Sequence, residues 1–324
     1  MKIQTLVFSF ISVFFITMIS SCLQPAESIT TLSPQVSSLP ASSATAMPQF
    51  TPTSISMPIT TPTMASTLPV EEAQEKLLNL LSNNGGCRLP CVWGITPGKS
   101  NYQEAQAILS PLAAISELTG FRPEGGAIFP VYDDGDLTLY TVIGFNVDSL
   151  SENPIVNRVG FRTEMHKPLQ EGGYENVFDS NFFGDIITAY TLPHVLSELG
   201  VPSSVMIATA GGPLTRGGTG GFAILMLYPD DGILVNYTTQ MHLMGTNMRG
   251  CPVNAHVEME LFPKGNSDSF FEFLKQGGWA IRLDYYRPLD EATSISVDEF
   301  YQTFREPNDK CIETPINLWP TPEP

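Results

Sequence analysis

Two stretches, Val131-Tyr132-Asp133-Asp134-Gly135-Asp136-Leu137 and Leu227-Tyr228-Pro229-Asp230-Asp231-Gly232-Ile233, decide the fold of this chain of 324 residues. Each places an Asp-Asp-Gly turn between runs of aliphatic and aromatic residues, which is the pattern of a β-hairpin. Each also follows a segment with a helix start signal. The sequence therefore predicts an α+β fold, in which short helices cover antiparallel sheets, with two similar helix-plus-hairpin units. Tandem duplication and shared turn chemistry explain the likeness equally well, because Asp-Gly is a common turn signal.

Local patterns predict the order of the elements around these turns. Helix signals are apolar residues three or four positions apart, N-capping residues and a stop at glycine or proline. They fall at Glu71–Leu81, at a capping box Ser100–Gln103 whose helix ends near Pro111, at Thr191–Gly200, at Asp268–Gln276, and at a capping box Ser296–Glu299 whose helix stops before Pro307. Strand signals fall at Ala127–Tyr132, Leu137–Val147, Ile155–Arg162, Ser203–Thr209, Gly221–Tyr228, Ile233–Thr239, His256–Phe262 and Trp279–Tyr285.

The first 22 residues predict where the protein is located. Lys2 precedes an apolar run that closes with Ile19-Ser20-Ser21-Cys22, and this pattern resembles the signal peptide and lipobox of bacterial lipoproteins. The resemblance implies removal of residues 1–21, acylation of Cys22 with palmitate or similar chains, and a lipid-anchored, extracytoplasmic protein of the cell membrane or cell surface. A permanent transmembrane segment is the alternative, and it also places the rest of the chain outside the cytoplasm. Leu23 lacks the aspartate that resembles an inner-membrane retention signal, and the choice between membranes stays open.

Residues 22–70 differ in composition from all that follows. Glu27 is the only charged residue between Leu23 and Val70, and Ser, Thr and Pro dominate. Such a segment cannot bury a core, so it predicts a disordered tether, either bare or glycosylated like a mucin stalk. We then expect a first α+β unit over 71–190, a second over 191–311 and a Pro-rich tail over 312–324.

The charge balance narrows the choice of partners. The chain carries a formal charge of −17, and loss of Lys2 leaves 15 cations against 33 anions, or −18. This acidity disfavours nucleic acid and anionic lipid headgroups. The expected partners are the membrane, through the lipid anchor, and an envelope protein or an extracellular ligand. A simpler explanation is that the acidity only keeps an exported protein soluble.

Four cysteines remain once Cys22 is set aside: Cys87, Cys91, Cys251 and Cys311. An even number in an exported domain indicates disulfides, with three ways to pair them. We favour Cys87 with Cys91, which close a tight loop, and Cys251 with Cys311, which flank the last globular segment. A zinc site that adds His242 and His256 is the alternative, but its spacing matches no known finger. We therefore expect no metal.

Two further segments resemble a known family. Trp93-Gly94-Ile95-Thr96-Pro97-Gly98-Lys99-Ser100 leads into a helix, and Leu196-Ser197-Glu198-Leu199-Gly200-Val201-Pro202 leads out of one. Both are similar to patterns in envelope lipoproteins of the BamE type and in the β-lactamase inhibitor protein fold. The resemblance covers about 40 residues, and it implies a binding or assembly role with no catalytic residues.

No catalytic or cofactor motif emerges from the chain. The four histidines stand outside His-Glu-x-x-His and Gly-x-Ser-x-Gly patterns, and Asp133-Asp134-Gly135-Asp136 lacks the spacing of an EF-hand. We therefore expect a noncatalytic binding or envelope-assembly protein without a cofactor, which binds through its outer sheet faces or through the Cys87–Trp93 loop, with Trp93 as a candidate contact. The alternative is an exported hydrolase that uses dispersed carboxylates such as Asp179, Asp185 and Glu198.

Overall fold

The computed structural model describes residues 67–148, 152–169, 173–178, 181–210, 221–253, 255–276 and 283–319. The expected signal peptide, Cys22, nearly all of the expected tether and Asp179 lie outside these residues. The helices are α1 (Val70–Asn83), α2 (Tyr102–Leu109), α3 (Asn181–Ile186), α4 (Leu192–Leu199), α5 (Ser267–Gln276), α6 (Leu289–Ala292) and α7 (Val297–Phe304). No helix within the described ranges has the length and apolarity to cross a membrane.

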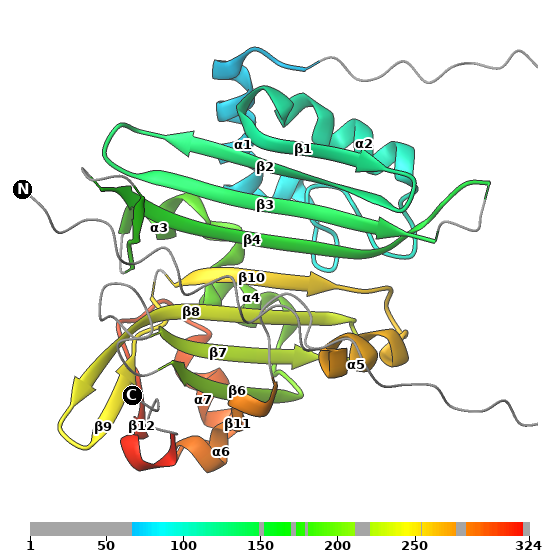
Figure 1. Cartoon of the computed structure of the whole chain (residues 1–324). Coiled ribbons are helices and arrows are strands. Elements are labelled where there is room, and N and C mark those ends of the chain that lie inside the picture. Colours follow the sequence, from blue (N-terminus) through cyan, green and yellow to red (C-terminus); the bar gives the residue numbers. More distant parts are fainter. Residues whose placement is uncertain are drawn as a thin grey trace, which may run out of the picture. The chain divides into compact units, whose positions relative to one another are not determined.

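The twelve described strands join one antiparallel sheet (Figure 1). They are β1 (Ser116–Arg122), β2 (Gly125–Asp133), β3 (Thr138–Val147), β4 (Val156–Pro168), β5 (Tyr174–Asn176), β6 (Ser204–Ala210), β7 (Gly221–Tyr228), β8 (Ile233–Met244), β9 (Asn247–Gly250), β10 (His256–Leu261), β11 (Arg287–Pro288) and β12 (Ile312–Pro315). The order across the sheet is β1-β2-β3-β4-β10-β8-β7-β6-β11, with β5, β9 and β12 branching from it. The predicted α+β fold is therefore confirmed.

The two halves of the chain repeat one arrangement. In the first, α2 precedes the meander β1-β2-β3-β4; in the second, α4 precedes β6, β7, β8 and β10. The predicted Asp-Asp-Gly turns join β2 to β3 and β7 to β8. Gly232 is required there, because its φ is +69° and a Cβ would lie 2.6 Å from the Phe262 carbonyl oxygen. The last strands of the halves, β4 and β10, pair at the centre, so the two expected units share one sheet.

Alternation of side chains gives the sheet two different faces. Inward residues of the central strands, such as Phe161, Val235 and Met259, join one large apolar core with the helices behind the sheet. Figure 1 shows α1, α2, α4 and α7 on that side. On the outer face, α5 covers one end through a second cluster made by Leu225, Leu227, Leu234, Phe262, Phe270, Phe273 and Leu274. The outer face of β3, β4 and β10 has no such apolar cover among the described residues.

Several boundaries differ from the sequence prediction. The first capping box is Asn101 with Glu104, one residue later than expected, because the Asn101 side chain accepts the Glu104 N–H. The predicted strand at 279–285 falls partly outside the described residues, and its end, Leu283–Tyr285, is a 3-10 helix. Strands β1, β5, β9, β11 and β12 were not predicted. The segment expected as a Pro-rich tail begins with β12, which pairs with β9, and Trp319 is buried.

Both predicted disulfides are confirmed. Cys87 is bonded to Cys91, and Cys251 to Cys311. The second bond connects the segment after β9 to the segment before β12, two strands that pair with each other. The alternative zinc site is wrong, because its cysteines are consumed by these bonds.

Candidate functional site

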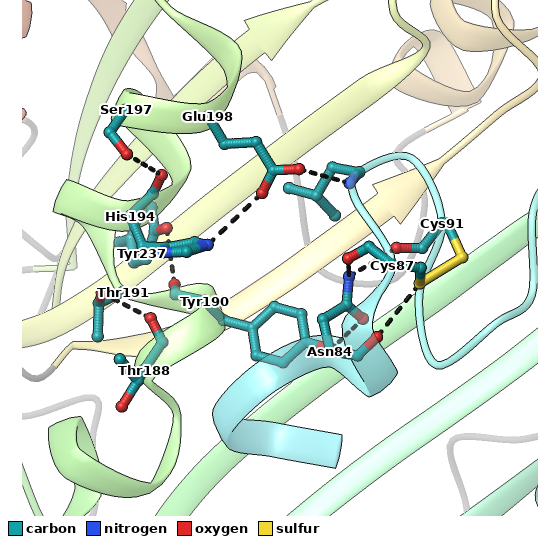
Figure 2. Close-up of polar contacts among 11 residues, drawn as sticks. Asn84, Cys87, Cys91, Thr188, Tyr190, Thr191, His194, Ser197, Glu198 and Tyr237 are labelled. Atoms are coloured by element: carbon teal, nitrogen blue, oxygen red, sulfur yellow. Dashed lines mark hydrogen bonds and ion pairs between the residues drawn. A yellow bond between two sulfur atoms is a disulfide. The ribbon is translucent and has the colours of Figure 1, made fainter. Parts of the chain in front are cut away.

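The disulfide loop is fixed by one buried side chain, that of Asn84 (Figure 2). Asn84 ends α1 in the left-handed conformation, with a φ of +56°, which asparagine tolerates well. Its Nδ2 donates to the carbonyl oxygens of Cys87 (2.9 Å) and Cys91 (2.8 Å). Its Oδ1 accepts from the Trp93 N–H (3.0 Å) and the Tyr190 hydroxyl (2.7 Å). We call this the Asn84 network; the amide makes four hydrogen bonds and is fully satisfied.

The Asn84 network places Trp93 in the core. The Trp93 side chain is only 3% exposed and packs edge-on against Phe161, with ring centroids 5.9 Å apart. Tyr190 stacks on the same Phe161 ring at 4.4 Å. The expectation that the loop displays Trp93 at the surface is therefore wrong, because the Asn84 amide turns the backbone inward at this point. A surface-exposed Trp93 contact with a ligand is thus excluded in this structure.

The two described carboxylates of the hydrolase alternative, Asp185 and Glu198, lie in different surroundings. Glu198 of α4 accepts the Leu89 N–H at 2.9 Å and lies 3.6 Å from His194 Nε2, so it holds the disulfide loop against the helix layer (Figure 2). Asp185 is exposed and lines a largely apolar cavity of about 270 Å³ on the helix side, where it is the only charged residue among the described lining. Asp179 lies outside the described residues.

A different set of ionisable side chains lies on the outer face of the two central strands. Every second residue of β4 and of β10 points there, and cross-strand pairing sets Arg162 opposite Glu258 and Gly160 opposite Glu260. We call this set the polar groove; its members are Arg158, Arg162, Glu164, His166, His256, Glu258 and Glu260. Polar residues at successive outward positions could have marked it in the sequence, as in Arg162-Thr163-Glu164-Met165-His166 and His256-Val257-Glu258-Met259-Glu260.

Glu164 has its charge compensated within the groove. Arg162 forms an ion pair with it, and Nε2 of His166 lies 3.0 Å from its Oε2. Burial alone would raise the pKa of Glu164, but the hydrogen bond from His166 and the charge of Arg162 outweigh burial and lower the pKa to about 2. Glu164 is therefore a paired carboxylate, ionised throughout the neutral range.

Glu260 and Glu258 are less well compensated. Glu260 is 1% exposed, and its Oε2 lies 3.6 Å from Arg158 Nε, a separation too long for a hydrogen bond. Burial raises the pKa of Glu260 to about 8, with Arg158 opposing and Glu258 adding to the rise. Burial also raises the pKa of Glu258, which Arg162 and a hydrogen bond from Asn236 oppose. Among the described residues, Glu258 Oε1 and Glu260 Oε2 have no hydrogen-bond partner.

Gly160 makes room for this arrangement. A Cβ at Gly160 would lie 3.3 Å from Oε1 of Glu260. The gap between Gly160, Glu258 and Glu260 is too small to admit even a water-sized molecule. Glu258 lines both this narrow gap and a larger cavity beside it. Of the two buried carboxylates, Glu258 is therefore the one whose side chain borders a cavity with room for a ligand.

Two open cavities flank the shared pair Arg162 and Glu164. One, the β10 compartment, has a volume of about 260 Å³; the other, the β3 compartment, has about 290 Å³. The β10 compartment is also lined by Asn176, Phe178, Ala223, Asn236, Thr238, His256, Val257, Glu258 and Tyr286. The β3 compartment is also lined by Glu117, Tyr140, Val142, His166 and Tyr174. Aromatic rings beside fixed polar groups are typical of small-molecule sites.

His256 closes the inner wall of the β10 compartment. Its Nε2 lies 3.2 Å from the Met165 nitrogen, whose N–H donates, and 2.9 Å from the Val177 carbonyl oxygen. Its ring stacks on Phe178, with centroids 4.6 Å apart. Burial lowers the pKa of His256 to about 4, although Glu164 opposes the shift. His256 is therefore neutral at pH 7 and serves as a wall of the compartment, not as a cation.

No described group of three or more His, Cys, Asp or Glu side chains is placed to hold a metal ion. No protein-family model, no curated protein and no solved structure matches this chain. The resemblance to lipoproteins of the BamE type and to the β-lactamase inhibitor protein fold therefore stays a prediction.

Proposed function

We propose that this chain is a noncatalytic, lipid-anchored extracytoplasmic protein that binds a small polar ligand in the polar groove. One observation carries the proposal: Glu258, a buried carboxylate with an unpartnered oxygen, lines an open cavity that two fixed aromatic rings also line. Unpaired buried polar atoms cost stability, so a protein that keeps one beside a cavity gains by filling that cavity. The groove forms where β4 and β10 join the two halves of the chain.

Binding fits the groove better than hydrolysis does. A general acid with a raised pKa and an ionised partner are the parts of a glycosidase-like pair. Glu260 has such a raised pKa, but the gap beside it is too small for a substrate. Glu164 is ionised, but Arg162 and His166 occupy its oxygens. The polar groove therefore offers fixed recognition groups without an accessible acid and base.

The anchoring part of the proposal is supported by the sequence of residues 1–22. Acylation of Cys22 would hold the folded residues outside the membrane on the Ser-, Thr- and Pro-rich segment. Replacement Cys22→Ala is expected to abolish metabolic labelling with palmitate. Persistent labelling in Cys22→Ala would contradict a lipid anchor at this position.

The binding part is tested by blocking the β10 compartment. Ala223 lines it, and Ala223→Phe would fill it whatever the charge of the ligand. The full chain, in a nonionic detergent, is screened by thermal unfolding against neutral sugars, amino acids, aliphatic amines and carboxylates. We expect at least one class to raise the melting temperature of the natural chain but not that of Ala223→Phe, because a ligand that binds only the folded state stabilises it. No stabilisation by any class, or equal stabilisation of both proteins, would contradict the proposal.

A further inference from the structure

The charges of the polar groove leave one carboxylate beside the β10 compartment without a cation of its own. Arg162 forms an ion pair with Glu164, which also contacts His166, and Arg158 lies beside Glu260. Glu258 is 9% exposed and receives a hydrogen bond from Asn236, yet its Oε1 has no partner among the described residues. Removing a charge from water without pairing it is costly, and a positively charged ligand would remove that cost.

The rings of Phe178 and Tyr286 line the same compartment as this carboxylate, and other contacts hold both in place. Phe178 is held by its stacking on His256, and Tyr286 is held because its hydroxyl donates to Asn236 Oδ1 at 3.2 Å. Both line the β10 compartment together with Glu258. The face of an aromatic ring attracts a cation, and rings that are already fixed lose little entropy on binding. The compartment thus combines a carboxylate with aromatic surfaces.

The charged residues that line the compartment also favour a positively charged ligand. Two carboxylates, Glu164 and Glu258, line it against one guanidinium, Arg162, while His256 is neutral at pH 7, and a bound cation would favour the ionised form of Glu258. A ligand with one positive charge would balance the sum, whereas an anion would add to the excess. Building on the proposed binding function, we infer that the ligand of the β10 compartment carries an ammonium group, which the Glu258 carboxylate holds beside Phe178 and Tyr286.

Three probes of one shape test this inference. Butylamine, 1-butanol and butyrate share a four-carbon chain and differ in charge, and their dissociation constants for the full chain are measured by calorimetry at pH 7. We expect butylamine to bind at least tenfold more tightly than the other two. We also expect Glu258→Gln to weaken butylamine at least tenfold, while Glu75→Gln, which removes the same charge from an exposed site on α1, leaves it unchanged.

A second variant covers the case in which Glu258→Gln does not fold. Phe178→Leu keeps an apolar side chain but removes the ring face, and it should weaken butylamine several-fold without weakening 1-butanol. If 1-butanol or butyrate binds as tightly as butylamine, and Ala223→Phe blocks that binding, the proposed binding function is supported but an ammonium ligand is contradicted. If butylamine does not bind, the inference falls. If no ligand class in the thermal-unfolding screen stabilises the chain either, the proposed function is contradicted too.

Discussion

Two buried polar clusters of this protein differ in whether the side chain at their centre has all its hydrogen bonds; beside the satisfied Asn84 amide, only the indole Nε1 of Trp93 lacks a partner among the described residues. In the Asn84 network, the amide of Asn84 makes four hydrogen bonds, and the Tyr237 hydroxyl donates to the Tyr190 carbonyl oxygen at 2.9 Å (Figure 2). In the polar groove, Glu258 and Glu260 each keep an oxygen without a partner among the described residues. A complete network stabilises the fold, whereas an incomplete one beside a cavity is better explained by a ligand.

The largest effect on stability is expected from breaking the complete network. Asn84→Ala removes four hydrogen bonds and puts alanine in a left-handed conformation, so the free energy of unfolding should fall by about 3 kcal/mol. Asn79→Ala, on the exposed face of the same helix, should change it by less than about 0.5 kcal/mol. Denaturant unfolding measures both. A loss below about 1 kcal/mol for Asn84→Ala would show that the network is not structural.

The next effect is a pH dependence that arises from Glu260. Its pKa is about 8 in the folded protein and about 4.5 when unfolded, so between these values only the folded state keeps the proton, and stability falls as pH rises. His256 acts in the opposite direction up to pH 6.5, because its folded pKa is about 4. From pH 6.5 to 8 the natural chain should therefore lose about 2 kcal/mol relative to Glu260→Gln, at about 1.4 kcal/mol per pH unit.

Denaturant titrations of both proteins at several pH values measure that difference. Glu260→Gln keeps the shape of the side chain and removes its ionisation, so other titrating groups contribute equally to both curves. Parallel curves between pH 6.5 and 8 would mean that Glu260 titrates normally and that the groove is better hydrated than its burial implies.

A smaller effect is expected from trimming the Asn84 network at one bond. Tyr190→Phe removes the hydroxyl that donates to Asn84 Oδ1 and keeps the ring that stacks on Phe161. Because the Trp93 N–H still donates to that oxygen, the loss should be only about 1 kcal/mol. Denaturant unfolding of Tyr190→Phe measures it. A loss as large as that of Asn84→Ala would assign the whole effect to this single hydrogen bond.

The smallest effect on stability is expected at the proposed ligand contact itself. Glu258→Gln replaces a carboxylate that lacks a full set of partners with a neutral side chain of the same shape, so the free energy of unfolding at pH 7 should change by less than about 1 kcal/mol. Thermal and denaturant unfolding check this value. A loss of about 3 kcal/mol or more would show that Glu258 is structural, like Asn84.

The sequence predicted the fold class, the two Asp-Asp-Gly turns and both disulfides, because these features depend on local turn chemistry and on cysteine spacing. It did not predict β1 or β12. Strand β1 is largely exposed at the edge of the sheet, and Leu118 there points to solvent, so it lacks apolar alternation. Strand β12 is four residues long and depends on β9 for its pairing.

The candidate site was harder to predict than the fold. Short disulfide loops usually lie at the surface, so the sequence indicated an exposed Trp93. In the structure, Asn84 Oδ1 accepts hydrogen bonds from the Trp93 N–H and from the distant Tyr190 hydroxyl, and the Trp93 side chain is buried. The polar groove was missed because Glu258 and Arg162 lie far apart in the sequence and meet only through pairing of β4 with β10. Polar residues at alternate positions are visible in both segments, but the sequence does not show that β4 and β10 pair with each other.

Alanine-methyl NMR of the full chain, titrated with butylamine, tests most directly whether the polar groove is a ligand site. The methyl group of Ala223 lines the β10 compartment, and that of Ala73 lies in the fully buried core under the other face of the sheet. We expect a saturable shift of the Ala223 signal and none for Ala73. A shift confined to Ala73, or equal shifts of both signals, would contradict it.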